Sequence, residues 1–334
     1  MVKKFKLKKT ILILSQKSDI STNRVIDYLI ASQKDFYRVN VDSDRLVDVR
    51  LDFEEGEVTK FILYFENKAP LDLNDVYSCW YRRGGIPMFP LPEMKDIYEL
   101  FKSEKISLKS REHLYAESRE LHEYIHWYLE THIEKTIGSQ SSAHINKLKQ
   151  LTVANSCGLP IPETKILTNF KNTSKATLIT KSIQDILHAQ DDINRYMYFT
   201  EDVPADDIND SIQFYPSLFQ HKIEKEYEIR IFYLHGTCYS MAIFSQADAK
   251  TQTDFRKYNF DKPNRNVPYK LPVDVEEKIV SFMHKINLNC GSLDLIYTKG
   301  QYYFLEVNPV GQFGAVSQAC SYNLESKIAE YLSN

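Results

Sequence analysis

Acidic and amide side chains gather near the carboxyl end of the chain, in the stretch GSLDLIYTKGQYYFLEVNPVGQFG. Glu306 and Asn308 are two residues apart in a run that predicts a β-strand, so their side chains share one face. Asp294 lies before a turn at Lys299-Gly300. A two-residue turn would place its side chain on the face opposite to Glu306, whereas a three-residue loop would place it on the same face. Two carboxylates and an amide oxygen on one surface would suit Mg²⁺.

The alternative interpretation of this hairpin is a solvated strand face with incidental acids. The neighbours of Glu306 argue against it, because Tyr302, Tyr303, Phe304 and Leu305 make the strand apolar and aromatic. A carboxylate among such residues is costly unless it is paired or liganded. The hairpin therefore predicts a cation site.

The elements that must position this hairpin fall into an α/β and an α+β part. The first third alternates strand and helix patterns, which favours an α/β layer. It predicts a buried strand at 11–14, a helix at 22–32, a strand at 36–41, a hairpin over 47–65 that turns at Glu55-Gly56, a strand at 76–82, a break at 84–92 and a long helix over 93–135. The small polar stretch 136–144 predicts a domain boundary.

The remainder of the chain predicts a small α+β unit followed by a β-rich unit. The pattern indicates a helix over 145–156, short strands at PETKI, TLITKSI and RYMYFT, a strand at LFQHKI, a hairpin that turns at His235-Gly236, a helix over 273–286, the hairpin with the acids, and a final helix that ends near Leu332. The polar loop between the first of these hairpins and the helix contains DFRKYNF.

Composition excludes several classes of protein. Only 10 of 334 residues are glycine, against a usual share of about 7%. Neither G-x-G-x-x-G nor G-x-x-x-x-G-K-[ST] occurs, so the two common glycine-rich phosphate loops are excluded. The net charge of −3 predicts no general binding of nucleic acid. The apolar run at 11–14 is too short for a signal peptide or a membrane span, and five scattered cysteines indicate reduced thiols in the cytoplasm.

A second motif indicates different chemistry. His122, Glu123 and His126 satisfy H-E-x-x-H on a predicted helix, the signature of a zinc metalloprotease. Leu129 stands where the longer form of the signature has glycine, so the helix is expected to continue to His132. His132 would then lie about 240° around the helix from His126 and could not share its metal. A solvated helix face is the favoured interpretation.

The motifs, taken in order, resemble those of the ATP-grasp ligases. D-x10-20-[LV]-E-[VI]-N-P closes a hairpin near the C-terminus, after INKLKQLTVANSCGLPIPET, TLITKS and LFQHKIEKEYEIRIFYL. CWYRRGG, DFR and FLEVNPVGQFG resemble one branch, the graspetide (microviridin-type) maturases that macrocyclise ribosomal peptides, and within it the grasp-with-SPASM subgroup. The resemblance implies an ATP-grasp fold with an N-terminal domain at 1–138, a central domain at 139–219 and a C-terminal domain at 220–334.

The resemblance also implies roles for individual residues. It implies ATP and two Mg²⁺ ions as cofactors, and it implies that the metal ligands are Asp294, Glu306 and Asn308. Lys147 and Lys181 would bind the phosphates of ATP, and Arg230 would contact the phosphate that is transferred. Adenine would be held by Gln220, Lys222 and Ile223, and the ribose by Glu228. We expect Arg256 and one of Arg82 and Arg83 to orient the acidic side chain of the substrate, because guanidinium suits carboxylates. Asp254, Asp191 and Asp192 are candidate contacts to the substrate or its leader peptide.

The reaction implied by the resemblance is carboxylate activation. A carboxylate attacks the γ-phosphorus of ATP to give an acyl phosphate, and a Ser, Thr or Lys side chain displaces the phosphate. Two anions must meet, so Mg²⁺, Lys and Arg are the expected apparatus. Implied partners are a precursor peptide with a leader, a SPASM-domain protein and a second copy of the chain. Alternatives are a carboxylate–amine ligase that adds an amino acid to a small molecule or protein tail, a zinc protease and a non-catalytic nucleotide-binding regulator.

Family members often cover the phosphates with a glycine-containing loop. No glycine lies between Gly158 and Gly236, so we expect polar groups near residues 182–194 to take that place.

Overall fold

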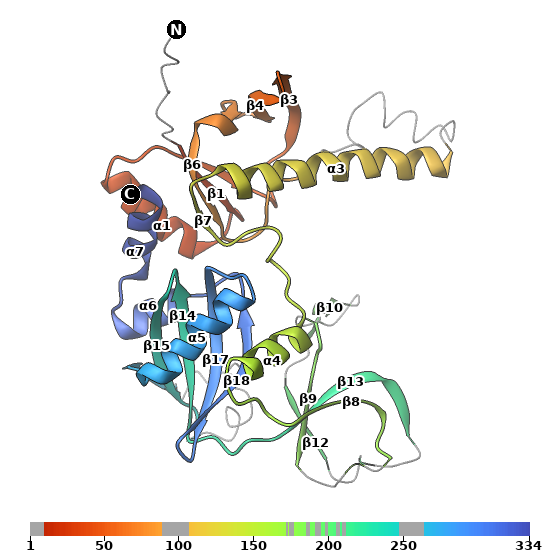
Figure 1. The fold of residues 1–334 in the computed structure, drawn as a ribbon, viewed down its shortest axis with the longest axis vertical. Helices are drawn as coiled ribbons and strands as arrows, with labels where there is room; N and C mark the ends of the chain where they lie inside the picture. The colour runs from red at the N-terminus through yellow and green to blue at the C-terminus, as the bar shows by residue number, and fades with distance from the viewer. Residues whose placement is uncertain are drawn as a thin grey trace. The chain divides into compact units, whose positions relative to one another are not determined.

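The computed structural model describes two compact units (Figure 1). The described residues are 10–88, 107–171, 173, 177–184, 188–190, 195–197, 200–204, 208, 212–246 and 264–334. Unit 1 comprises Met1–Ala143 and Asn323–Asn334, and unit 2 comprises His144–Tyr322. The end of the chain thus belongs to unit 1, whereas the sequence-based division kept it with the C-terminal domain.

A four-stranded parallel sheet forms the centre of unit 1. Its order is β2 (Phe36–Asn40), β1 (Thr10–Ser15), β6 (Val76–Tyr81) and β7 (Lys135–Ile137). Residues 11–14 of β1 are fully buried, which confirms the predicted strand and fits a sheet covered on both faces. Helix α1 (Ile20–Ala31) links β1 to β2 and begins after Asp19, whose carboxylate accepts a hydrogen bond from the Thr22 amide.

A hairpin and two helices complete unit 1. Strands β3 (Leu46–Glu54) and β4 (Glu57–Phe65) turn at Glu55-Gly56 as predicted, and β5 (Leu71–Asp72) and the 3₁₀-helix η1 (Leu73–Asp75) follow. Helix α3 (Leu108–His132) packs on this hairpin, where the Phe61 and Tyr128 rings are 5.0 Å apart. Helix α7 (Leu324–Ser333) lies beside α1 (Figure 1), and the Tyr28 hydroxyl donates to Asn323 at its start.

Two predicted helix boundaries are wrong. The helix predicted to reach Lys135 ends at His132, because buried Ile133 is extended and Lys135–Ile137 pairs with β6. The single helix predicted at the C-terminus is two, α6 (Gly314–Cys320) and α7, because Ser321 and Asn323 between them have positive φ. Both errors reflect local backbone states that residue type alone does not dictate.

The smaller sheet of unit 2 is antiparallel. Its order is β12 (Glu201–Val203), β9 (Leu178–Lys181), β13 (Gln213–His221) and β8 (Thr164–Asn169), and β10 (His188–Gln190) pairs separately with β11 (Arg195–Met197). Phe170, Leu178 and Phe219 form a small core. Helix α4 (Lys147–Ser156) precedes this sheet and begins after Asn146, whose side chain accepts from two backbone amides.

The larger sheet of unit 2 carries the acidic hairpin. Its antiparallel order is β16 (Arg265–Tyr269), β15 (Thr237–Phe244), β14 (Tyr227–Leu234), β17 (Cys290–Thr298) and β18 (Gln301–Asn308). Helix α5 (Val273–Lys285) covers one face and buries Ile279 and Phe282 against Ile231 and Leu293. Residues that alternate with Ile231 and Leu293 therefore face away from α5. No helix among the described stretches is long and apolar enough to cross a membrane.

Candidate active site

Three charged side chains form a row across the face of the larger sheet that points away from α5. Arg230 on β14 pairs with Asp294 on β17, which pairs with Glu306 on β18. One terminal nitrogen of Arg230 donates to both oxygens of Asp294, at 3.0 and 2.9 Å. Directly opposed like charges destabilise a sheet. The negative charges of the two facing carboxylates therefore require nearby positive charge, and Arg230 supplies part of it.

A β-bulge brings the two carboxylates onto one face. The Lys299-Gly300 turn has two residues, both with positive φ, and Thr298 pairs with Gln301. From the turn, regular pairing of β17 with β18 extends to Leu295, which lies opposite Phe304. The register then shifts by one residue, and Asp294 pairs with Glu306. Leu305 is the additional residue, so a two-residue turn does not separate the acids. A bulge re-aims side chains in this way and is frequent beside active sites.

Asn308 completes the set of oxygen donors that the sequence predicts. It pairs with Ser292 across the sheet, two residues beyond Glu306 on the same face. Its side-chain oxygen accepts a hydrogen bond from the Val310 amide at 3.0 Å, which fixes the amide group and leaves the oxygen a second lone pair. Two facing carboxylates and an oriented amide oxygen fit the ligand preferences of Mg²⁺.

Lys147 compensates the second carboxylate. It is the first residue of α4, and its Nζ lies 3.4 Å from Glu306 and donates to the carbonyls of Ser182 at 3.3 Å and Gln184 at 3.1 Å. Helix α4 is fixed along edge strand β18, because Gln150 accepts from the Val307 amide at 2.9 Å. Arg230, Asp294, Lys147 and Glu306 retain 13, 17, 16 and 22% side-chain exposure, so all four are accessible but weakly hydrated.

The second predicted lysine lies beside the first. Lys181 is the last residue of β9, pairs with Leu218 and is half-buried. It directly precedes Ser182, whose carbonyl Lys147 contacts. The structure thus brings both lysines to the end of β9, although 35 residues separate Lys147 from Ser182.

The predicted adenine hinge links the two sheets of unit 2. Gln220 is fully buried on β13, its amide nitrogen donates to Thr164 Oγ1 at 2.9 Å, and its side-chain oxygen has no partner among the described residues. Lys222 directly follows β13. Its backbone amide donates a hydrogen bond to the Thr177 carbonyl at 2.9 Å, and its Nζ lies 2.6 Å from Asp202. Ile223 is half-buried between β13 and β14.

Two residues around Glu228 were missed by the sequence analysis. The Glu228 carboxylate is buried, forms an ion pair with Lys225 and accepts from Ser245 at 3.3 Å. Glu228 and Arg230 share one face of β14. The three-residue spacing of Lys225 and Glu228 was a signal in the sequence for this ion pair. Ser245 directly follows β15, and no sequence signal connected it with Glu228.

Arg82 and Arg83 both contact Asp19 in unit 1. The Arg82 Nε lies 3.6 Å from Asp19, and the Arg83 Nε donates to the same oxygen. Burial raises the pKa of Asp19, but Arg82, the Thr22 amide and Arg83 outweigh burial and hold the pKa below its usual value. Asp19 therefore caps α1 and joins the two arginines to it. No sequence motif marked Asp19 as the partner of these arginines.

The H-E-x-x-H stretch is not a metal site. His122 and His126 both bind the backbone of Ile86, and among the described residues no cluster of three or more His, Cys, Asp or Glu could hold a metal. Helix α3 continues to His132, as predicted from Leu129. The His132 ring stacks on Tyr128 and not beside His126. The favoured interpretation of a solvated helix face is wrong for His126, which is 4% exposed.

Four candidate residues lie outside the described residues. They are Asp191, Asp192, Asp254 and Arg256.

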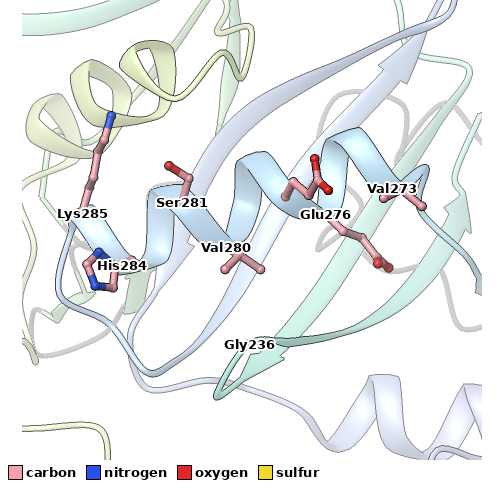
Figure 2. Close-up of a pocket in the computed structure, with 8 residues that line it drawn as sticks. Gly236, Val273, Glu276, Val280, Ser281, His284 and Lys285 are labelled. Atoms are coloured by element: carbon pink, nitrogen blue, oxygen red, sulfur yellow. The ribbon is translucent and has the colours of Figure 1, made fainter.

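A hollow of about 630 Å³ lies between α5 and the β14–β15 turn (Figure 2). Gly236 of the β14–β15 turn and Val273, Val280 and His284 of α5 contribute to its lining. The chemistry-bearing side chains Arg230 and Asp294 point to the opposite face, so this hollow is not the candidate active site.

Comparison with known proteins identifies the fold. Neither a protein-family profile nor a curated protein matches the chain. A RiPP-associated ATP-grasp ligase from Chryseobacterium gregarium, in complex with ADP and a leader and core peptide, is 24% identical with a TM-score of 0.76, over 97% of this chain and 95% of that one. The macrocyclase MdnC from Microcystis aeruginosa MRC, bound to precursor peptide MdnA, is 25% identical with a TM-score of 0.70, over 97% and 99%.

A third relative extends the same group. The ATP-grasp ligase PsnB, complexed with a precursor variant, Mg and ADP, is 14% identical with a TM-score of 0.65, over 98% of each chain. The chain described here therefore has the ATP-grasp fold, and its structural relatives are RiPP-associated ATP-grasp ligases. This confirms the predicted fold.

Proposed function

We propose that this chain is an ATP- and Mg²⁺-dependent, ADP-forming peptide ligase. It activates a side-chain carboxylate of a ribosomal precursor peptide and joins it to a Ser or Thr hydroxyl or a Lys amine, which closes a macrocyclic ester or amide. The observation that carries the proposal is the row of Arg230, Asp294 and Glu306 with Lys147 beside it. Its support is a fold whose relatives include ligases with bound ADP, Mg and precursor peptides.

The oxygen donors of the hairpin would hold the metal. Asp294, Glu306 and Asn308 are the residues that would hold two Mg²⁺ ions, and the two carboxylates face each other on neighbouring strands. Bound Mg²⁺ would neutralise phosphate charge and orient the γ-phosphate. Each carboxylate already contacts a cationic side chain, Asp294 that of Arg230 and Glu306 that of Lys147.

Cationic side chains would place ATP and the attacking carboxylate. Lys147 and Lys181, close together at the end of β9, are assigned to the phosphates, and Arg230 to the transferring phosphoryl group. Gln220, Lys222 and Ile223 are assigned to adenine, since buried Gln220 Oε1 can accept from an exocyclic amine. Glu228, held by Lys225 and Ser245, is assigned to the ribose hydroxyls. Arg256 and Asp254 remain proposed substrate residues, and Asp191 and Asp192 proposed leader contacts.

The two chemical steps need positioning more than covalent help. The peptide carboxylate attacks the γ-phosphorus, and a hydroxyl or amine of the same peptide then displaces phosphate from the acyl carbon. Holding both groups of one peptide together supplies a high effective concentration for the second step. We assign Arg230 to stabilise charge on the phosphoryl oxygens during the first step.

Further partners belong to the same proposal. We assign the chain to the grasp-with-SPASM subgroup and expect a SPASM-domain protein and a second copy of the chain as partners. None of the five cysteines, Cys79, Cys157, Cys238, Cys290 and Cys320, forms a disulfide, which supports action in a reducing cytoplasm.

The test is direct synthesis of the crosslink. The chain is incubated with ATP, Mg²⁺ and each small acidic peptide with Ser, Thr or Lys encoded beside its gene, and the products are weighed by mass spectrometry. The proposal expects the loss of one water mass per crosslink with wild type and with Glu277→Gln, an exposed acid on α5. It expects no loss with Glu306→Gln. Unchanged mass for every peptide with wild type would contradict the proposal.

A further inference from the structure

The segment that follows β6 occupies the edge of the unit 1 sheet where ligands usually bind. From β1 the chain winds through α1 to β2 on one side, and from β6 it winds through α3 to β7 on the other. The carboxyl ends of β1 and β6 therefore form a switch point, the general location of ligand sites in open parallel sheets. The amides of Arg82 and Arg83 both donate to the Leu14 carbonyl at the end of β1, at 2.9 and 3.2 Å.

Two histidines hold both backbone groups of one residue in this segment. The Ile86 amide donates to His126 Nε2 at 3.2 Å, and His122 Nε2 donates to the Ile86 carbonyl at 2.7 Å. The two rings lie one helical turn apart on α3, 4.6 Å between centroids and edge to face. A single residue is thus fixed by two side chains of one rigid helix.

The hydrogen bonds assign the proton on His126. Its Nε2 accepts from Ile86, so the proton is on Nδ1, which donates to the Tyr81 hydroxyl at 3.2 Å. Burial, with a smaller contribution from His122, lowers the pKa of His126 to about 3. The ring therefore stays neutral and keeps its acceptor nitrogen throughout the physiological range.

The glycines of the segment let its backbone sit directly on these groups. A Cβ on Gly85 would lie 2.6 Å from His126 Cε1 and 2.8 Å from Gln140 Oε1. Gly84 has a φ of +107°, and its Cβ would lie 2.6 Å from a methyl group of Val41. The backbone of residues 84–86 is thus enclosed between α3 and the end of β2, with no room for side chains at either glycine.

The segment carries two arginines that differ in exposure. Arg82 and Arg83 both contact the carboxylate of Asp19, and the Arg83 side chain is 37% exposed whereas that of Arg82 is 3% exposed. A partly exposed guanidinium beside a fixed backbone turn suits capture of a carboxylate.

We infer that His122 and His126 are positioning residues that fix residues 82–86 as a rigid platform, from which Arg83 binds a carboxylate of the acidic substrate peptide. The inference rests on the proposed function for the identity of the peptide. It assigns the H-E-x-x-H stretch a role in substrate binding in place of a metal. Neither histidine touches the reacting atoms.

The experiment separates peptide binding from ATP binding. We expect His122→Ala to raise the KM for the precursor peptide about tenfold, the cost of about one buried hydrogen bond, and to leave the KM for ATP unchanged. His122→Gln places an amide nitrogen near the lost donor and is expected to restore most of the peptide KM. His113→Ala is the matched control, because His113 is an exposed histidine of the same helix.

Hydrogen exchange provides a measurement that does not depend on activity. The Ile86 amide is expected to exchange about tenfold faster in His126→Ala or His122→Ala than in wild type, and at an unchanged rate in His113→Ala. Unchanged exchange at Ile86, or a KM for ATP that rises with that for peptide, would overturn the inference. If wild type ligates no peptide, the proposed function fails. The exchange rates of the Ile86 amide then still decide whether His122 and His126 fix residues 82–86.

Discussion

Protonation of His126 is expected to make the free energy of unfolding depend on pH. The native pKa is about 3, because burial opposes the charged ring, whereas the ordinary value of 6.5 applies to the unfolded chain. As the pH falls below 6.5, His126 binds a proton in the unfolded state but stays neutral in the native state. This contribution to stability is complete above about pH 6.5 and is lost progressively down to about pH 3.

The magnitude follows from the same two values. One pKa unit is worth about 1.4 kcal/mol, so the interval from 6.5 to about pH 5 lowers the free energy of unfolding by about 2 kcal/mol. Other titrating groups contribute as well, but they are common to wild type and to His126→Gln, whose amide does not titrate.

The assay compares denaturant unfolding of both proteins at about pH 7 and about pH 5. We expect wild type to lose about 2 kcal/mol more than His126→Gln between the two pH values, and His113→Gln, which removes an exposed histidine, to behave as wild type. An equal loss in wild type and His126→Gln would refute the reasoning that His126 is buried and neutral.

Three further outcomes are expected in unit 2. Glu306→Gln removes one of the two facing carboxylates and should reduce peptide-dependent phosphate release by about a hundredfold or more, measured with saturating Mg²⁺. Arg230→Lys keeps the charge but loses one of the two terminal nitrogens, which contact Asp294 and Gln312 respectively, so kcat should fall about tenfold or more while the fold, measured by circular dichroism, is kept. Gly311→Ala should lower the free energy of unfolding by about 1–3 kcal/mol, because φ is +66° and the new Cβ would lie 2.9 Å from Cys290 Sγ; an unchanged denaturation midpoint would contradict this.

The acidic hairpin shows what the sequence could predict. Residue types and spacing predicted the two strands, the turn at Lys299-Gly300 and the common face of Glu306 and Asn308. The face of Asp294 could not be decided, because it depends on a bulge at Leu305 that lies outside the turn. A register shift of one residue leaves no mark in residue type.

Long-range contacts set a second limit. Local pattern predicted that α3 continues past Leu129, but not that His122 and His126 bind a backbone residue 36 and 40 positions earlier. Arg82 and Arg83 were identified as candidate carboxylate binders, and their contact with Asp19, 64 residues before Arg83, was out of reach for the same reason. Such contacts depend on the tertiary arrangement of strands, which spacing alone does not specify.

The most direct test of the central claim follows an oxygen atom. A precursor peptide is labelled with oxygen-18 in its side-chain carboxylates and incubated with the chain, ATP and Mg²⁺, and the released phosphate and nucleotide are analysed by mass spectrometry. Carboxylate activation as an acyl phosphate predicts one oxygen-18 atom in inorganic phosphate for each crosslink formed, with ADP unlabelled. Label in AMP, or crosslinks formed without label in phosphate, would contradict the account.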